Sequence, residues 1–157
     1  MQQQYTKYLV LAWGNPGRGD DAAGLVIAES LERYVSDDVT IRVFHQLGPE
    51  LAEDVAHSEH VIFLDAHMHP QWPDLVVREV DPAGDYTPDS HSSSPEELLA
   101  LAKVLYHRRP KAHLVAIRAF DTTFGAGMSA RGKELAAQAL SVVRGMLPTR
   151  PLSSSSS

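Results

Sequence analysis

Short apolar runs and longer amphipathic stretches alternate along most of the chain. Continuous or every-second apolar residues predict strands at 8–12, 39–44, 61–64, 75–80 and 113–117. Helical spacing and helix-start residues predict helices at 22–34, 49–57, 94–105 and 129–147. Because strands and helices alternate, with one pair of strands in direct succession, we expect a three-layer α/β/α sandwich with a mostly parallel central sheet.

The clearest local signals lie in two of these elements. The run Val-Ile-Phe-Leu at 61–64 is the most apolar of the chain and stops at Asp65, which predicts a central parallel strand. Ser94, followed by Pro95 and then by Glu97, predicts a helix start with a capping box. The run at 75–80 is interpreted as an edge strand. The strand at 39–44 is expected to turn three residues inward: Val39, Ile41 and Val43.

The composition is that of an ordinary soluble domain and restricts the function. A net charge of −6 without a basic stripe argues against nucleic-acid binding. No cysteine is present, so any metal must be bound by carboxylate, imidazole or backbone oxygen. No run approaches the roughly 20 apolar residues of a membrane span, and the start lacks a signal-peptide pattern, so we expect a cytoplasmic protein. We expect one domain over 1–150 and a disordered Ser-rich tail at 151–157.

A glycine-rich loop with two aspartates follows the first predicted strand. It reads Gly14-Asn15-Pro16-Gly17-Arg18-Gly19-Asp20-Asp21 and leads into a predicted helix. A helix start offers free N–H groups and a positive dipole, and in such loops it usually binds an anion. Here the carboxylates of Asp20 and Asp21 stand at the helix start. A loop with this charge is suited to bind a cation rather than an anion. We expect one aspartate to cap the helix and the other to face a ligand.

A dinucleotide site is the main alternative for this loop. Residues 17–22 fit the pattern G-x-G-x-x-A. However, the two acids would repel a pyrophosphate, and the next predicted strand ends in Phe-His-Gln without the acid that binds a ribose hydroxyl. The sequence therefore disfavours nucleotide binding.

A third acid, Asp65, follows the central strand. Parallel strands end at one edge of a sheet, so Asp65 is expected at the same edge as Asp20 and Asp21. A carboxylate beside an apolar run is costly to desolvate unless it is paired. In an extended segment His67 and His69 would point to the same side as Asp65, which offers one metal site. His91, in a polar loop, is a candidate ligand if the fold brings that loop to the strand ends.

Other hydrolytic signatures are missing from the sequence. It contains no G-x-S-x-G elbow, no H-E-x-x-H motif, no cysteine nucleophile and no Walker loop. A carboxylate site linked to a metal ion is what remains.

The glycine loop resembles the opening motif of the hydrogenase maturation proteases, the endopeptidases that process the large subunit of nickel–iron hydrogenases. The resemblance continues through Leu-Asp-Ala at 64–66, through His91 with the helix start at 94–97, and through Phe-Gly-Ala-Gly-Met-Ser at 124–129. It covers nearly all of residues 7–147. The resemblance implies an α/β sandwich and a cytoplasmic peptidase that recognises metal through carboxylates, compatible with an aspartic-type classification.

The resemblance also implies the residues of the site and its partner. Carried over, the metal ligands are Asp21, Asp65 and His91, and the two acids are the catalytic candidates, as base or only as ligands. The metal is nickel presented by the hydrogenase large-subunit precursor, with zinc or cadmium as substitutes in crystals, and the C-terminal peptide is then removed. We expect a monomer. A non-cleaving metal-binding chaperone of the same precursor remains the alternative function.

Overall fold

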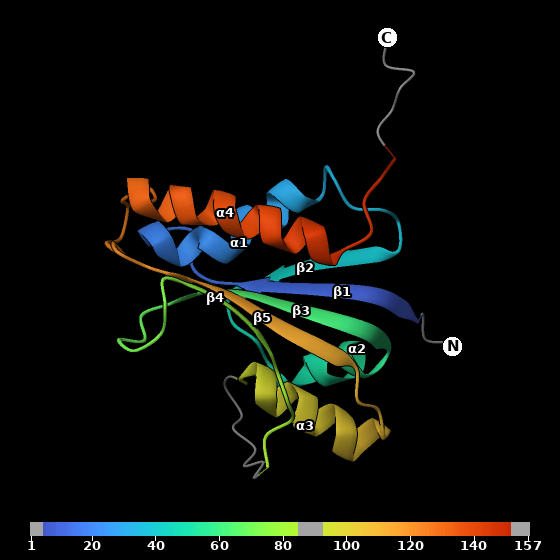
Figure 1. Cartoon of the computed structure of the whole chain (residues 1–157). Helices are drawn as coiled ribbons and strands as arrows, with labels where there is room; N and C mark the ends of the chain where they lie inside the picture. Colours follow the sequence, from blue (N-terminus) through green and yellow to red (C-terminus); the bar gives the residue numbers. More distant parts are fainter. Residues whose placement is uncertain (1–4, 85–92, 152–157) are drawn as a thin grey trace.

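The computed structural model describes residues 5–84 and 93–151 and forms three layers, as the sequence predicts (Figure 1). Residues 152–157 of the predicted tail lie outside the described residues, and so does His91. The strands are β1 (Thr6–Trp13), β2 (Val39–Phe44), β3 (Ser58–His67), β4 (Leu75–Glu79) and β5 (Lys111–Arg118). The helices are α1 (Ala23–Leu31), α2 (Ala52–Ala56), α3 (Pro95–Tyr106) and α4 (Ala130–Met146), with short 3-10 turns η1 (Gly19–Ala22) and η2 (Pro49–Leu51).

The five strands form one sheet in the order β2-β1-β3-β5-β4. The pairs β1–β2, β1–β3 and β3–β5 are parallel, and the edge strand β4 is antiparallel to β5. Helices α1 and α4 cover one face of the sheet, and α2 and α3 cover the other (Figure 1). The mostly parallel sheet is therefore confirmed.

The central strand β3 carries the core of both layers. Val61 and Phe63 pack in the cluster beneath α2 and α3, while Ile62 and Leu64 pack in the cluster beneath α1 and α4. All four are buried. Helices on both faces explain why this strand reads as a continuous apolar run rather than an alternating one.

Three sequence predictions differ from the structure in detail. Strand β3 continues beyond Leu64 to His67, so Asp65 lies inside the strand rather than after it. Helix α1 ends at Leu31, three residues before the predicted limit. Val43 is 55% exposed rather than turned inward, because β2 is an edge strand with one neighbour only.

The helix start at Ser94 is confirmed in full. The Ser94 hydroxyl accepts from the Glu97 N–H, and the Glu97 carboxylate accepts from the Ser94 N–H, both at 3.1 Å. Pro95 occupies the first position of α3. Within the described ranges, no helix combines the length and apolar character needed to cross a membrane.

Strands β1, β3 and β5 all end at the left edge of the sheet in Figure 1. The loops that follow them, and the first turns of α1 and α4, meet there. We call this the carboxyl edge. It is where ligands are bound in open α/β sheets.

Candidate active site

The loop after β1 is built around two close backbone contacts. A Cβ at Gly14 would overlap the carbonyl oxygen of Asp21, and a Cβ at Gly19 would overlap that of Asp121. Gly19 also has a φ of +52°, which favours glycine. These contacts fold the loop back on the start of α1 and fix the direction of its two acids.

Asp20 is fully buried and ties this loop to the segment between β5 and α4. Its carboxylate accepts from the N–H groups of Phe120 and Ser129, both at 2.8 Å, from the Asp121 N–H at 3.2 Å, and from the Ser129 hydroxyl at 2.7 Å. A Cβ at Gly132 would overlap this carboxylate. We call this set of hydrogen bonds the Asp20 clamp.

The hydrogen bonds of the clamp favour the ionised form of Asp20. Burial acts to raise the pKa of this carboxyl, but the Ser129 hydroxyl and three backbone N–H groups outweigh burial and hold the pKa below its usual value. The structure corrects the expectation that one aspartate caps the helix: neither η1 nor α1 has a side-chain cap. Asp20 has a structural role through a different contact, with residues about one hundred positions later.

Asp21 points away from the clamp and is only partly buried. Its Oδ2 accepts from the backbone N–H of Asn15 at 2.7 Å. The side chain of Asn15 in turn accepts from the Gly17 N–H at 2.8 Å, which makes the loop rigid around the acid. The adjacent aspartates thus occupy different environments.

Asp65 reaches the same edge from β3. The start of α1 lies against the end of this strand, because a Cβ at Gly24 would stand 2.7 Å from the Leu64 carbonyl oxygen. Burial raises the pKa of the Asp65 carboxyl to about 7; the hydrogen bond from the Ala66 N–H opposes this shift, and the negative charge of Asp21 adds to it. The two acids therefore interact electrostatically, and Asp65 exchanges a proton near neutral pH.

His67 does not join these acids. It is buried, its Nε2 donates to the Pro73 carbonyl at 2.9 Å, and its Nδ1 accepts from the His69 N–H at 3.2 Å. Burial lowers the pKa of the imidazole, and the charge of Arg118 lowers it further. Because both ring nitrogens are occupied, His67 fixes the β3–β4 loop and is not a metal ligand.

His69 also belongs to that loop. Its Nδ1 accepts from the Gln71 N–H at 3.2 Å, and its ring stacks on Trp72 with centroids 4.8 Å apart. Among the described residues, no three His, Asp or Glu side chains are placed to hold a metal ion. The alternative site of Asp65, His67 and His69 is therefore not formed.

The third predicted ligand, His91, lies outside the described residues. The next described residue is Ser93, whose N–H donates to the carbonyl of Leu47 at 3.0 Å. Leu47 lies in the segment between β2 and η2. The prediction for His91 stays a prediction.

Sequence reasoning did not identify the contribution of Ser129. This residue caps α4 through the Gly132 N–H and also donates its hydroxyl to Asp20. In the sequence, the motif at 124–129 indicates only a resemblance to the family. A serine before a helix predicts a cap, but nothing local indicates a buried carboxylate as its second partner.

Solved structures resemble this one over nearly its whole length, although no protein-family model and no curated protein sequence matches the chain. The hydrogenase maturating endopeptidase HybD from E. coli has a TM-score of 0.69 and 26% identity, over 94% of this chain and 99% of that one. An endopeptidase from Escherichia coli has a TM-score of 0.72 and 22% identity, over 95% and 99%. The NiFe hydrogenase maturation protease HycI from Thermococcus kodakarensis KOD1 has a TM-score of 0.67 and 22% identity, over 90% and 92%.

These likenesses bear out the resemblance noticed in the motifs. The chain shares its fold with proteins named as a hydrogenase maturating endopeptidase and a hydrogenase maturation protease. The likeness extends over 94% of this chain in the first of these structures.

Proposed function

We propose that this protein is an endopeptidase of the hydrogenase maturation type, which removes the C-terminal peptide from the nickel-loaded precursor of a nickel–iron hydrogenase large subunit. The observation that carries the proposal is the pairing of Asp21 and Asp65 at the carboxyl edge, with the pKa of Asp65 raised to about 7. The fold shared with named maturation endopeptidases supports it.

Two carboxylates from different elements suit a divalent metal ion that another protein presents. Carboxylate oxygen is a ligand for nickel and for zinc, and a site with few protein ligands leaves positions for substrate groups. We assign Asp21 and Asp65 to this recognition, with His91 as the third ligand that the family resemblance implies. The nickel belongs to the precursor and is part of the substrate.

The proposal also gives the same two acids a part in hydrolysis. A carboxylate that has lost its proton can accept one from the attacking water, and the resulting acid can return it to the leaving amine as the C–N bond breaks. As ligand or as base, Asp65 has to be ionised. Because its pKa lies near 7, we expect processing at subsaturating precursor to rise with pH through about 7 and then to level off.

The direct test compares nickel-loaded with nickel-free precursor. The purified protein is incubated with each, and the mass of the precursor is followed. The proposal expects loss of a C-terminal peptide from the nickel-loaded form alone. Equal cleavage of both forms, or cleavage of neither, would contradict it; stable binding of nickel-loaded precursor without peptide release would identify a maturation chaperone instead.

A further inference from the structure

Three large apolar side chains stand exposed at the carboxyl edge. Met68 is 69% exposed, Phe120 46% and Phe124 72%. Met68 is the first residue after β3, and Phe120 is the second residue after β5. The two strand ends are joined by the hydrogen bond from the Ala119 N–H to the His67 carbonyl at 2.9 Å. Exposed apolar groups gathered around a candidate active site indicate a contact surface.

The two aromatic rings are carried by a loop that is fixed in place. The Asp20 clamp holds it at Phe120 and again at Ser129. Between these points, the Gly125 N–H donates to the Gly17 carbonyl at 2.8 Å, which joins the loop to the one after β1. A partner that buries these rings loses little conformational entropy, because the backbone beneath them is already ordered.

A positive charge lies beside one of the rings. The exposed guanidinium of Arg18 stands 5.6 Å from the centre of the Phe124 ring. Nearby arginines have acidic partners: Arg118 and Arg131 both lie within ion-pair distance of Asp74. In the described part of the chain, no acidic side chain forms an ion pair with Arg18. Arg18 is thus available to an acidic group of a partner.

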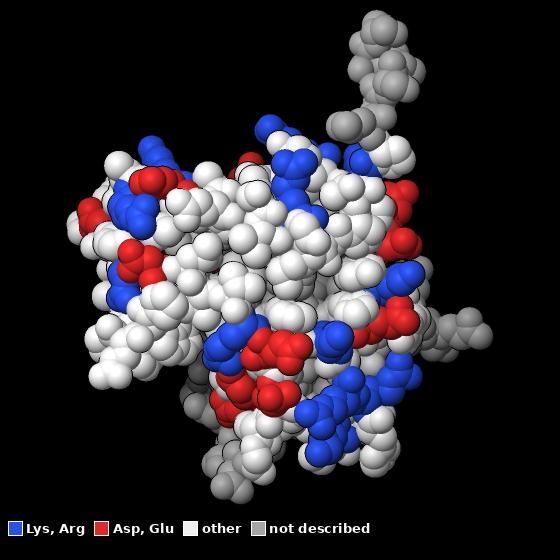
Figure 2. All heavy atoms as spheres, viewed as in Figure 1, with Lys and Arg blue, Asp and Glu red and all other residues white. Residues whose placement is uncertain are grey.

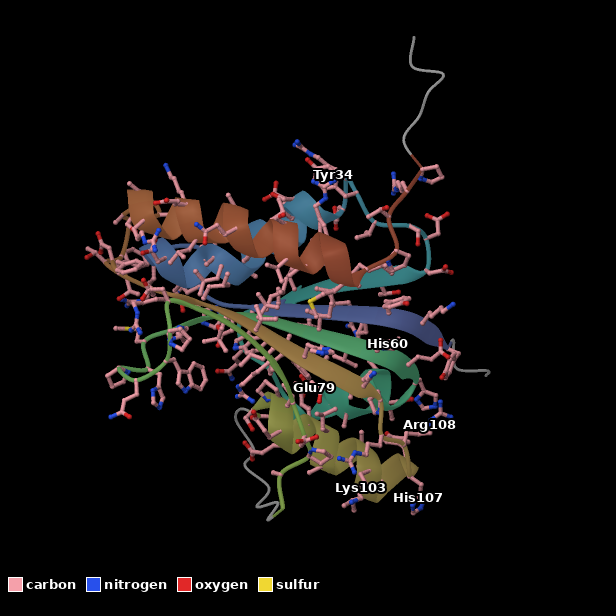
Figure 3. All side chains as sticks on the ribbon, viewed as in Figure 1. Tyr34, His60, Glu79, Lys103, His107 and Arg108 are labelled. Atoms are coloured by element: carbon pink, nitrogen blue, oxygen red, sulfur yellow. The ribbon has the colours of Figure 1, made fainter. Side chains whose placement is uncertain are left out.

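Two of these exposed residues lie close in sequence to the two acids of the candidate site. Arg18 precedes Asp21 by three residues, and Met68 follows Asp65 by three. Figure 3 shows the opposite end of the molecule by contrast, where Lys103, His107 and Arg108 mark the end of α3. On the face drawn in Figure 2, acidic and basic groups are mixed, and no basic area extends across it.

We propose that Arg18, Met68, Phe120 and Phe124 form a docking surface for the hydrogenase precursor, here called the edge patch. It receives an apolar segment of the precursor that carries an acidic residue beside it, and so presents the neighbouring peptide bond to Asp21 and Asp65. This inference rests on the proposed function. The apolar groups provide affinity on desolvation, and Arg18 selects the acidic neighbour.

The test is a comparison of kinetic constants for precursor processing. Phe124→Ala and Phe120→Ala are each expected to raise KM about tenfold with kcat little changed, since truncating an anchor weakens binding without touching the reacting groups. Leu105→Ala is the matched control, because Leu105 is 56% exposed on α3 and should leave both constants unchanged. Unchanged KM in both phenylalanine variants would overturn the docking surface.

The charge of Arg18 is tested by a second pair of variants. Arg18→Glu is expected to raise KM tenfold or more and to reverse the dependence of KM on salt, while Arg18→Lys stays within a few fold of the unchanged protein. Equal KM values for Arg18→Glu and Arg18→Lys would contradict the role of an acidic neighbour in the precursor.

A binding measurement separates this inference from the proposed function. Nickel-free precursor, which the proposed function expects to stay uncleaved, is titrated onto the unchanged protein and onto Phe124→Ala, and the oligomeric state of each protein is measured by sedimentation. Weaker binding on loss of the ring supports the edge patch even if the unchanged protein releases no peptide. If Phe124→Ala processes the precursor normally, with unaltered KM and unaltered binding, the edge patch is contradicted while the proposed function stands. A dimer that Phe124→Ala converts to monomer also contradicts the edge patch, since the surface then serves a second copy of the chain.

Discussion

Asp20 and Asp21 are neighbours in the chain and have opposite roles in the structure. Asp20 is buried and accepts four hydrogen bonds, which hold its pKa low and join two distant segments. Asp21 is partly exposed and lies close enough to Asp65 to raise the pKa of that carboxyl. The first environment stabilises a fixed charge. The charge of Asp21 in the second environment adds to the burial that raises the pKa of Asp65 to about 7.

One loop supplies both the structural acid, Asp20, and Asp21, whose charge acts on Asp65 of β3. A carboxylate surrounded by donors is stable in one ionisation state and contributes rigidity. A buried carboxyl next to another acid is destabilised when it is charged, and that is the condition under which it binds a cation or accepts a proton. Asp20 accepts four hydrogen bonds, which stabilise its charged form and hold the loop. Asp65 accepts a hydrogen bond from the Ala66 N–H, which does not offset the effect of burial on its pKa.

The largest expected effect is on catalysis at the reactive pair. Asp21→Asn and Asp65→Asn should each lower precursor processing by roughly 10³-fold, since each removes an ionisable ligand or base from the site. The helical circular-dichroism signal should stay unchanged, because neither side chain supports the core. Processing at the wild-type rate in either variant contradicts the assignment.

The next effect falls on the stability of the fold at the clamp. Asp20→Ala removes the acceptor of three partly buried N–H groups and one hydroxyl, and we expect a loss of about 3–5 kcal/mol in the free energy of unfolding. Asp21→Ala is the matched variant one residue away and should lose less than about 1 kcal/mol. Urea unfolding of both proteins measures the difference; equal losses would show that the two acids do not differ as described.

A smaller effect links the reactive pair to stability through pH. The pKa of Asp65 is about 7 in the folded protein against a model value of 3.8. Between these values the folded state binds more protons than the unfolded state, so stability falls as pH rises through this window. Asp65→Asn removes that titration and should be more stable than the unchanged protein by roughly 2–4 kcal/mol at pH 8, with little difference at pH 3. A pH-independent difference would argue against the raised pKa.

The smallest effect concerns Ser129, which serves both the cap and the clamp. Ser129→Ala should destabilise the fold by about 1–2 kcal/mol, because the hydroxyl bonds to Asp20 and to the Gly132 N–H are lost together. Ser129→Thr keeps the hydroxyl and is the control. Thermal unfolding of the two variants gives the comparison, and equal midpoints would contradict the double role.

The sequence alone predicts the strands and helices of the fold. It does not predict that Asp20 has a structural role while Asp21 faces the site. The apolar run at 61–64 and the capping residues Ser94 and Glu97 act locally, so their patterns predict the central strand and the start of α3. Asp20 and Asp21 look alike because the partners of Asp20 are about one hundred residues away. His67 appeared as a candidate ligand since its acceptor, Pro73, lies in a loop whose path has no periodic signal.

The most direct measurement is a carbon-13 NMR titration of the side-chain carboxyl groups in the unchanged protein and in Asp21→Asn. We expect a midpoint near 7 for Asp65 and a lower midpoint once the charge of Asp21 is removed, while Asp20 stays ionised throughout this range. A midpoint for Asp65 near 4, or one that does not respond to Asp21→Asn, would contradict the interacting pair on which the proposed function depends.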